Sequence, residues 1–328
     1  MAAPLADAPP TDCLVLQPIA AVGIERLRRA GLVVHVAARP DLDTLRAHLA
    51  TARAVITRNA GFSAAAIAAA PRLVVIGSHG TGVDAIDLAA ARARGIAVVN
   101  TPGANARSVA ELAIALMLAC ATSLIPADRA VRAQDFGWRL RARSFELGGK
   151  RLGLVGFGAI ARRVAPVAQA LGMDVEALSR HAAAPELAGL GIAKSESLDA
   201  LLAACDVVSL HGLPTGATLL DAAAIARMKP GAILVNTARG ALVDEAALAA
   251  ALTEGRLAAA GLDVFSPEPP LPGNPLFAAP NLVLSPHIGG AASEAMDRTA
   301  LAVAEAVLSR LEDQVGVRAD DGGSRHRS

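Results

Sequence analysis

The chain has 328 residues, enough for about two domains with large cores. Its formal net charge is +1 and only 2% of its residues are aromatic, so it lacks the positive field and the base-stacking side chains of a nucleic-acid-binding protein. The three cysteines, Cys13, Cys120 and Cys205, form no CxxC pair, which argues against a disulfide framework and against a zinc site.

The first part of the chain alternates short β-branched runs with helical patterns. The expected strands cover 13–16, 32–36, 54–57, 73–76 and 97–100, and the expected helices between them cover 24–30, 42–50, 64–69 and 88–94. This βαβα order predicts a parallel, doubly wound sheet, and the unbroken apolarity of the strands indicates that both faces are covered.

A long helix is predicted next, from Ser108 to about residue 133, with Ser108 and Glu111 spaced as in a capping box. A second series follows, with expected strands 151–155, 174–178, 207–210, 232–236, 259–262 and 282–285 and expected helices 159–171, 198–204, 221–228 and 245–254. A last helix covers about 292–311, and the polar end, 316–328, is expected to be disordered. We therefore predict an α/β fold with two doubly wound parallel-sheet domains, in which ligands bind beyond the carboxyl ends of the strands.

A strand–turn–helix segment with two glycines opens the second series. In Gly156-Phe157-Gly158-Ala159-Ile160, Gly156 permits the tight turn, and Gly158 lets a pyrophosphate approach the free N–H groups at the helix start. Ala161 takes the third glycine position, where only close helix–strand packing is at stake. We expect this turn to bind a dinucleotide.

The residues after the second strand of this series bear on the choice of cofactor. Ser179 and Arg180 stand where NAD-binding proteins usually place an acidic residue for the adenosine ribose. A carboxylate there would repel a 2′-phosphate, whereas serine and arginine would accept it, arginine through charge-assisted hydrogen bonds. We favour NADP(H); the alternative is that Arg180 is a solvated loop charge and NAD(H) is accepted as well.

Several motifs together resemble the D-isomer-specific 2-hydroxyacid dehydrogenases, the group that contains glyoxylate/hydroxypyruvate reductases and D-3-phosphoglycerate dehydrogenases. They are Gly80-Thr81-Gly82-Val83-Asp84, Asn100-Thr101-Pro102-Gly103, Ser108-Val109-Ala110-Glu111, Met228-Lys229-Pro230-Gly231-Ala232, and the segments 236–240, 263–269 and 285–290. The resemblance covers about residues 12–312. It implies a flavodoxin-like substrate domain over 1–102 completed by the C-terminal helix 288–315, a Rossmann domain over 103–287, and a cleft between them.

The resemblance also assigns catalytic residues. Arg239 would hold the carboxylate of a 2-oxo acid, because a guanidinium forks onto planar carboxylates. His287 would donate the proton to the forming alkoxide, since its ordinary pKa of about 6.5 suits that work at neutral pH. Glu268 would hydrogen-bond His287 and favour its protonated form. The related formate dehydrogenases are expected to carry glutamine there, so Glu268 argues against formate oxidation.

Further binding contacts follow from the same resemblance. The backbone N–H groups of Thr81 and Gly82 would bind the substrate carboxylate, and Asp263 would receive the nicotinamide carboxamide. The remaining cofactor contacts would come from Ser108, His211, Thr237 and Ala238. No metal and no covalent intermediate is required.

The expected activity is hydride transfer from NAD(P)H to a small 2-oxo acid of the glyoxylate or hydroxypyruvate type, giving the D-2-hydroxy acid. The second candidate is an NAD-dependent D-3-phosphoglycerate dehydrogenase, because the motif at 108–111 resembles the one in that branch of the family. Two points argue against it: Ser179-Arg180 disfavours NAD, and we expect no regulatory domain after residue 312. Phosphite oxidation and a non-catalytic, corepressor-like binding protein are remote alternatives, because both keep the arginine, glutamate and histidine.

Partners and location are the last expectations. The resemblance implies a homodimer joined through the long helix after residue 105. The composition and the short apolar runs lead us to expect no nucleic-acid or membrane partner. The start of the chain lacks a secretory signal, and no apolar run approaches the roughly 20 residues of a membrane span. We therefore expect a cytoplasmic protein.

Overall fold

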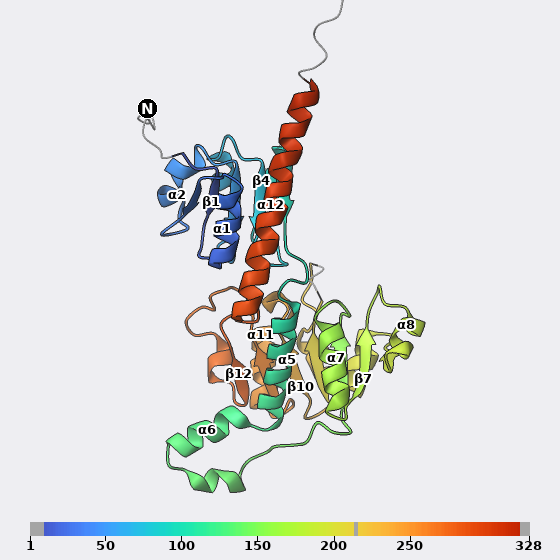
Figure 1. Ribbon diagram of the computed structural model, residues 1–328. Coiled ribbons are helices and arrows are strands. Elements are labelled where there is room, and N and C mark those ends of the chain that lie inside the picture. Colours follow the sequence, from blue (N-terminus) through green and yellow to red (C-terminus); the bar gives the residue numbers. More distant parts are fainter. Residues whose placement is uncertain (1–9, 213–215, 322–328) are drawn as a thin grey trace, which may run out of the picture. The chain divides into compact units, whose positions relative to one another are not determined.

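The computed structural model describes residues 10–212 and 216–321, which form two compact units (Figure 1). Unit 1 is Met1–Asn105 with Ala291–Ser328, and unit 2 is Ala106–Gly290. Both boundaries lie a few residues from those expected. Residues 322–328 of the tail, which we expected to be disordered, lie outside the described residues.

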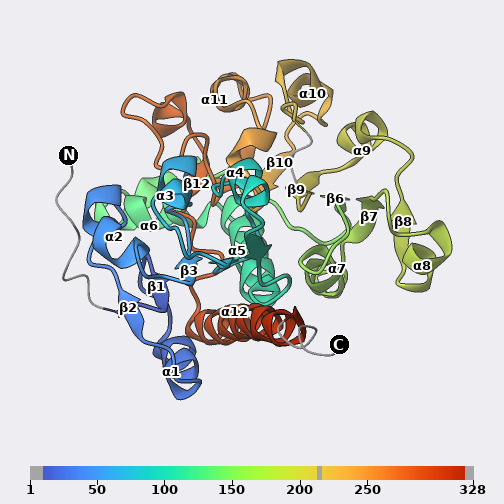
Figure 2. The ribbon, with the colours of Figure 1, turned by 90° about the horizontal axis from the view of Figure 1, so that it is seen from above.

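Unit 1 contains a parallel sheet in the order β2-β1-β3-β4-β5, which is the flavodoxin-like order. Its strands are β1 (Cys13–Val15), β2 (Val34–Val36), β3 (Ala54–Thr57), β4 (Val75–Ser78) and β5 (Ala97–Val99). Helices α1 (Ala21–Arg29) and α12 (Ser293–Asp321) cover one face, and α2 (Leu42–Leu49), α3 (Ala64–Ala68) and α4 (Leu88–Ala93) cover the other (Figure 2). The predicted doubly wound sheet is confirmed.

Helix α12 lies close against this sheet and against α1, because small residues leave room for it. A Cβ on Gly23 would lie 2.6 Å from the Ala300 carbonyl oxygen, and a Cβ on Gly77 would lie 2.7 Å from Val303 Cγ2. The buried side chains of α12 join the core under β1, β3 and β4; they include Ala300, Val303, Ala304 and Val307. The helix continues to Asp321, past the ends at about 311 and at 315 that we expected, so the prediction of disorder is wrong for residues 316–321.

Unit 2 contains a parallel sheet in the order β12-β11-β10-β9-β6-β7-β8. Its strands are β6 (Arg151–Val155), β7 (Asp174–Leu178), β8 (Ile192–Lys194), β9 (Val207–Leu210), β10 (Ile233–Asn236), β11 (Ala259–Leu262) and β12 (Leu282–Leu284). Helices α5 (Ala106–Ala121) and α7 (Ala161–Ala170) cover one face; α9 (Leu198–Ala204), α10 (Ala222–Arg227) and α11 (Glu245–Thr253) cover the other (Figure 2). Along β10, Ile233 and Val235 pack on the face that α5 and α7 cover, and Leu234 packs on the face that α9, α10 and α11 cover. Both faces of the sheet are therefore apolar, as predicted.

The predicted helix over 108–133 is wrong in two respects. The segment forms two helices, α5 and α6 (Leu124–Arg132), bent by 62° at the break. Ser123 has a φ of 52° there, and Pro126 in the first turn of α6 has no N–H with which to continue a helix from residue 122. Helix α5 also begins at Ala106, so Ser108 lies inside it and does not cap it.

The remaining short elements in the described part of the chain are α8 (Ala184–Gly189) and the 3-10 helices at Phe136–Leu140, Gly240–Leu242 and Pro275–Ala278. Within the described residues no single helix has the length and apolar composition needed to cross a membrane, although the bent pair α5–α6 meets both criteria when its halves are taken together. All three cysteines are buried and free, and burial raises the pKa of the Cys120 thiol to about 12. Cys120 and Cys205 are thus the buried small residues that we expected.

Candidate active site

Arg239 is carried on a turn that follows β10. The turn is set by Asn236, whose buried side chain accepts a hydrogen bond from Ala238 N–H (3.0 Å) and donates one to the Arg239 carbonyl (2.8 Å). The Arg239 guanidinium itself donates to the Ala238 carbonyl (2.7 Å). Asn236 was not among the predicted site residues, although a polar residue closing an apolar strand is a typical start for such a side-chain-bonded turn.

Gly240 brings this turn against the loop that follows β11. A Cβ on Gly240 would lie 2.0 Å from the backbone carbonyl carbon of Phe265, so no other residue fits without moving the backbone. Because β10 and β11 are neighbours in the sheet, their carboxyl ends and the loops that follow meet at one edge.

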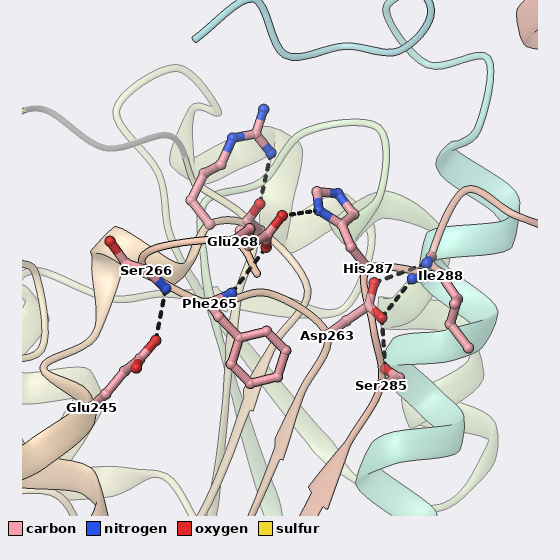
Figure 3. Close-up of polar contacts among 11 residues, drawn as sticks. Glu245, Asp263, Phe265, Ser266, Glu268, Ser285, His287 and Ile288 are labelled. Carbon is pink, nitrogen blue, oxygen red and sulfur yellow. Dashed lines mark hydrogen bonds and ion pairs between the residues drawn. The ribbon is translucent and has the colours of Figure 1, made fainter. Parts of the chain in front are cut away.

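Glu268 and His287 form a close pair at the same edge (Figure 3). Glu268 Oε2 lies 2.7 Å from His287 Nδ1, and Glu268 Oε1 accepts a hydrogen bond from Phe265 N–H (3.0 Å). The two side chains are 32% and 38% exposed, respectively, so the pair is open to a ligand on one side and anchored to the protein on the other.

The charges around the pair favour a protonated imidazole. The hydrogen bond to Glu268 raises the pKa of His287; burial opposes it, the negative charges of Glu268 and Asp263 add to it, and the positive charge of Arg239 opposes it. For Glu268, burial acts to raise the pKa, but the bonds from His287 and Phe265 and the charges of His287 and Arg239 outweigh burial and lower it. Arg239, Glu268 and His287 therefore lie within electrostatic reach of one another, and their catalytic roles stay a prediction.

Asp263, buried at the end of β11, holds the loop that carries His287. Its carboxylate accepts hydrogen bonds from Ser285 Oγ (2.6 Å), Ile288 N–H (2.8 Å) and Gly289 N–H (2.8 Å). Its backbone carbonyl also accepts a bond from His287 N–H (2.9 Å). These bonds stabilise His287 at a φ of 54°, which a non-glycine residue seldom adopts. A contact between Asp263 and a nicotinamide stays a prediction.

The glycine turn has the geometry expected of a phosphate-binding segment. Gly156 has a φ of 94°, and a Cβ there would lie 2.9 Å from Gly212 N, so glycine is required. A Cβ on Gly158 would meet nothing within 4 Å, which leaves open space beside the N-terminal end of α7. The Phe157 ring is fixed by Arg162, whose guanidinium carbon lies 4.8 Å from the ring centroid.

Two buried polar atoms lie at the same edge without a hydrogen-bond partner among the described residues. They are His211 Nδ1, after β9, and Thr237 Oγ1, after β10. The other ring nitrogen, His211 Nε2, lies 2.9 Å from Ser209 Oγ, and burial lowers the pKa of His211 to about 4, so this imidazole is neutral. Buried polar groups are nearly always bonded, so both atoms fit a site that a polar ligand completes. Ala238 is buried beside them, and Ser108 is buried in α5.

The loop after β7 contains the residues that bear on the ribose phosphate. Ser179 Oγ accepts hydrogen bonds from His181 N–H (3.2 Å) and Ala182 N–H (3.0 Å), so Ser179 shapes the loop. Arg180 is exposed at its tip.

Thr81 and Gly82 lie in the loop after β4, in unit 1. Ser78 Oγ donates to the Gly82 carbonyl (2.6 Å), and Asn100 Nδ2 donates to the Thr81 carbonyl (2.7 Å). Their role toward a substrate held by Arg239 stays a prediction, because Arg239 belongs to unit 2. Among the residues that the structure describes, no group of three or more histidine, cysteine, aspartate or glutamate side chains could hold a metal ion.

Comparison with known proteins agrees with this geometry. Residues 114–289 match the model for the D-isomer specific 2-hydroxyacid dehydrogenase, NAD binding domain. The chain belongs to the D-isomer-specific 2-hydroxyacid dehydrogenase family. Unit 2 of this family member is thus its NAD-binding domain, and the predicted family resemblance is confirmed.

The curated relatives and solved structures include enzymes of both predicted substrate groups. D-3-phosphoglycerate dehydrogenase of Mycobacterium tuberculosis is 44% identical over 276 residues, 83% of this chain and 52% of the relative. Hydroxypyruvate reductase of Thermotoga maritima is 42% identical over 250 residues, 75% of this chain and 80% of the relative. The TT0316 protein from Thermus thermophilus superposes with a TM-score of 0.82 at 39% identity, covering 92% of this chain and 97% of that one. This family member thus spans about half the length of the phosphoglycerate dehydrogenases that it resembles.

Proposed function

We propose that this protein reduces a small 2-oxo acid to the D-2-hydroxy acid with NAD(P)H. The observation that supports the proposal most directly is the His287–Glu268 pair, with Arg239 in electrostatic reach of both, at the edge that carries the glycine turn. Hydride addition to a carbonyl needs a group that stabilises the developing negative charge on oxygen and a group that donates a proton; a permanent cation and a protonated imidazole can supply these two functions.

Arg239, His287 and Glu268 each have a separate role in the proposed reaction. When bound, NAD(P)H supplies the hydride. Arg239 binds the substrate carboxylate and stabilises the oxyanion that develops at the carbonyl oxygen. His287 gives its proton to that oxygen, and Glu268 orients the imidazole and keeps it protonated beforehand. In the direction of oxidation His287 takes the proton back.

Replacing His287 by asparagine tests the proposal. We expect kcat for 2-oxo acid reduction to fall by about 10²–10⁴-fold, with the affinity for NAD(P)H unchanged. His35→Asn is the matched control, because His35 lies on β2 of unit 1 and stacks on His48. A near-normal kcat in His287→Asn would rule out His287 as the proton donor. If the wild-type protein bound the cofactor but turned over no 2-oxo acid, that result would favour a corepressor-like protein.

The substrate group has two candidates. We propose glyoxylate or hydroxypyruvate as the substrate class, which the 42% identity to a hydroxypyruvate reductase supports. The 44% identity to D-3-phosphoglycerate dehydrogenases favours D-3-phosphoglycerate as the second candidate. Comparing kcat/KM for glyoxylate, hydroxypyruvate and phosphohydroxypyruvate decides between them; a preference for the phosphorylated acid by tenfold or more would favour the second.

Cofactor choice and assembly are two further proposals. We propose a preference for NADP(H), supported by Ser179 and exposed Arg180 after β7.

We also propose a homodimer that uses the segment from α6 through the 3-10 helix Phe136–Leu140, because exposed apolar side chains gather there: Leu124, Val131, Phe136 and Leu140. Light scattering of the wild type and of Phe136→Ser tests the dimer; a wild-type monomer would exclude it.

A further inference from the structure

Glu245 is the first residue of α11, and both oxygens of its carboxylate are bonded to residues outside that helix. The helix start is already capped by Asp244, whose Oδ1 accepts hydrogen bonds from Ala246 N–H and Ala247 N–H, both at 3.0 Å. Glu245 is therefore not needed as a cap, and its contacts lie elsewhere.

The two oxygens of Glu245 hold the two ends of the loop after β11. Oε1 accepts a hydrogen bond from Ser266 N–H (2.8 Å; Figure 3), and Oε2 accepts one from Asn274 Nδ2. Asn274 Oδ1 in turn accepts from Leu276 N–H (3.0 Å) at the start of the next 3-10 helix. One carboxylate thus clamps the segment 266–274.

This segment has few backbone bonds of its own. Four of its residues are prolines, at 267, 269, 270 and 272, and proline has no N–H to donate. Its described internal backbone bond runs from Asn274 N–H to the Leu271 carbonyl (3.1 Å). The position of the segment therefore depends on side chains that reach it, Glu245 among them.

Glu268 lies inside the clamped segment. The successive N–H groups of Phe265 and Ser266 donate to two carboxylates, the first to Glu268 Oε1 and the second to Glu245 Oε1. The other oxygen of Glu268 meets His287 Nδ1 at 2.7 Å. Glu245 is thus linked to the imidazole through the backbone of Phe265 and the side chain of Glu268.

We propose that Glu245 is a positioning residue, which fixes the loop that presents the Glu268 carboxylate to His287. Its kinetic consequence rests on the proposed function, but its structural consequence does not. The charged groups in electrostatic reach of the imidazole are Glu268, Asp263 and Arg239, and only Glu268 lies in the loop that Glu245 holds. Loosening that loop weakens the Glu268 bond and leaves the other two charges in place.

The decisive measurement is an NMR titration of the His287 ring in the protein without ligand, assigned with His287→Asn. In Glu245→Ala we expect the imidazole to bind its proton about 3–10-fold more weakly than in the wild type, because the bond to Glu268 is its main stabilising contact. Glu245→Gln keeps one acceptor oxygen and is expected to show a smaller change. Glu254→Gln, an exposed glutamate at the other end of α11, is the matched control and should titrate as the wild type does.

Kinetics separate this inference from the proposed function. The pH above which reduction slows should fall in Glu245→Ala, with KM for NAD(P)H within about twofold of wild type. An unchanged His287 titration in folded Glu245→Ala, or in Glu245→Gln if the alanine variant does not fold, would overturn the inference, even if the melting temperature fell. A shifted titration with an unshifted rate profile would uphold the positioning role and remove His287 as the proton donor.

Discussion

Asp263 offers the sharpest test of how the site is built. In Asp263→Asn the amide oxygen can keep the bonds from Ser285 Oγ and Ile288 N–H, but the amide nitrogen then faces Gly289 N–H, which loses its acceptor. Asp263 is 1% exposed, so water cannot replace the lost bond. Leaving a buried donor unpaired costs about 1–3 kcal/mol.

That cost should appear as easier local opening of the His287 loop. A loss of about 1–3 kcal/mol corresponds to amide exchange about 5–150-fold faster at Ile288 and Gly289, measurable by hydrogen-exchange mass spectrometry on a peptide covering 285–290. The negative charge of Asp263 also raises the pKa of His287, so the pH above which reduction slows should fall. We expect kcat to fall with it.

A matched control and a contrary result define the test. Asp221→Asn makes the same chemical change at the start of α10, where the carboxylate accepts from Ala224 N–H (2.8 Å), and should leave exchange over 285–290 unchanged. If Asp263→Asn also leaves that exchange unchanged while weakening cofactor binding, the carboxylate serves the nicotinamide and not the loop.

Three further substitutions probe the remaining assignments. Glu268→Gln removes the negative charge that raises the pKa of His287. Because reduction needs the protonated imidazole, the rate should begin to decline with rising pH about one pH unit lower than in the wild type. An unshifted pH–rate profile would contradict the pairing of Glu268 with His287. Arg239→Lys should lower kcat/KM for a 2-oxo acid by about 10²-fold or more, since lysine is a point charge without the fork; a loss under fivefold would remove the bidentate role. Arg180→Ala should raise KM for NADPH about tenfold and leave KM for NADH unchanged, and equal effects on both cofactors would remove the specificity argument.

The sequence predicted most strands for physical reasons, whereas the family resemblance singled out Arg239, Glu268 and His287, and the topology explains why these three meet. Buried parallel strands are continuous apolar runs, and β6, β7, β9 and β11 begin and end where their runs predict. Arg239, Glu268 and His287 each follow a strand, and β10, β11 and β12 are neighbours in a parallel sheet, so their carboxyl ends share one edge.

The features that the sequence did not predict have either a weak local apolar pattern or contacts between residues far apart in the chain. The three residues of β8 include one buried side chain, Ile192, which is too little apolar signal to mark a strand. The break at Ser123 was hidden by the strong helical pattern on either side of Pro126. The contacts of the Asp263 and Glu245 side chains join residues 21 to 29 positions apart, and no spacing rule pairs them.

Unit 1 is made of two parts of the chain that are separated by unit 2, and this arrangement affects the order of folding during synthesis. Its sheet is encoded before unit 2, but helix α12, which covers Val15, Ile56 and Val75, is encoded after unit 2. Unit 2 can therefore fold while residues 10–105 still present an apolar face that α1 covers without α12. A premature stop codon after residue 290 would remove α12, leave the part of that face that α12 covers exposed to solvent, and make the product prone to aggregate.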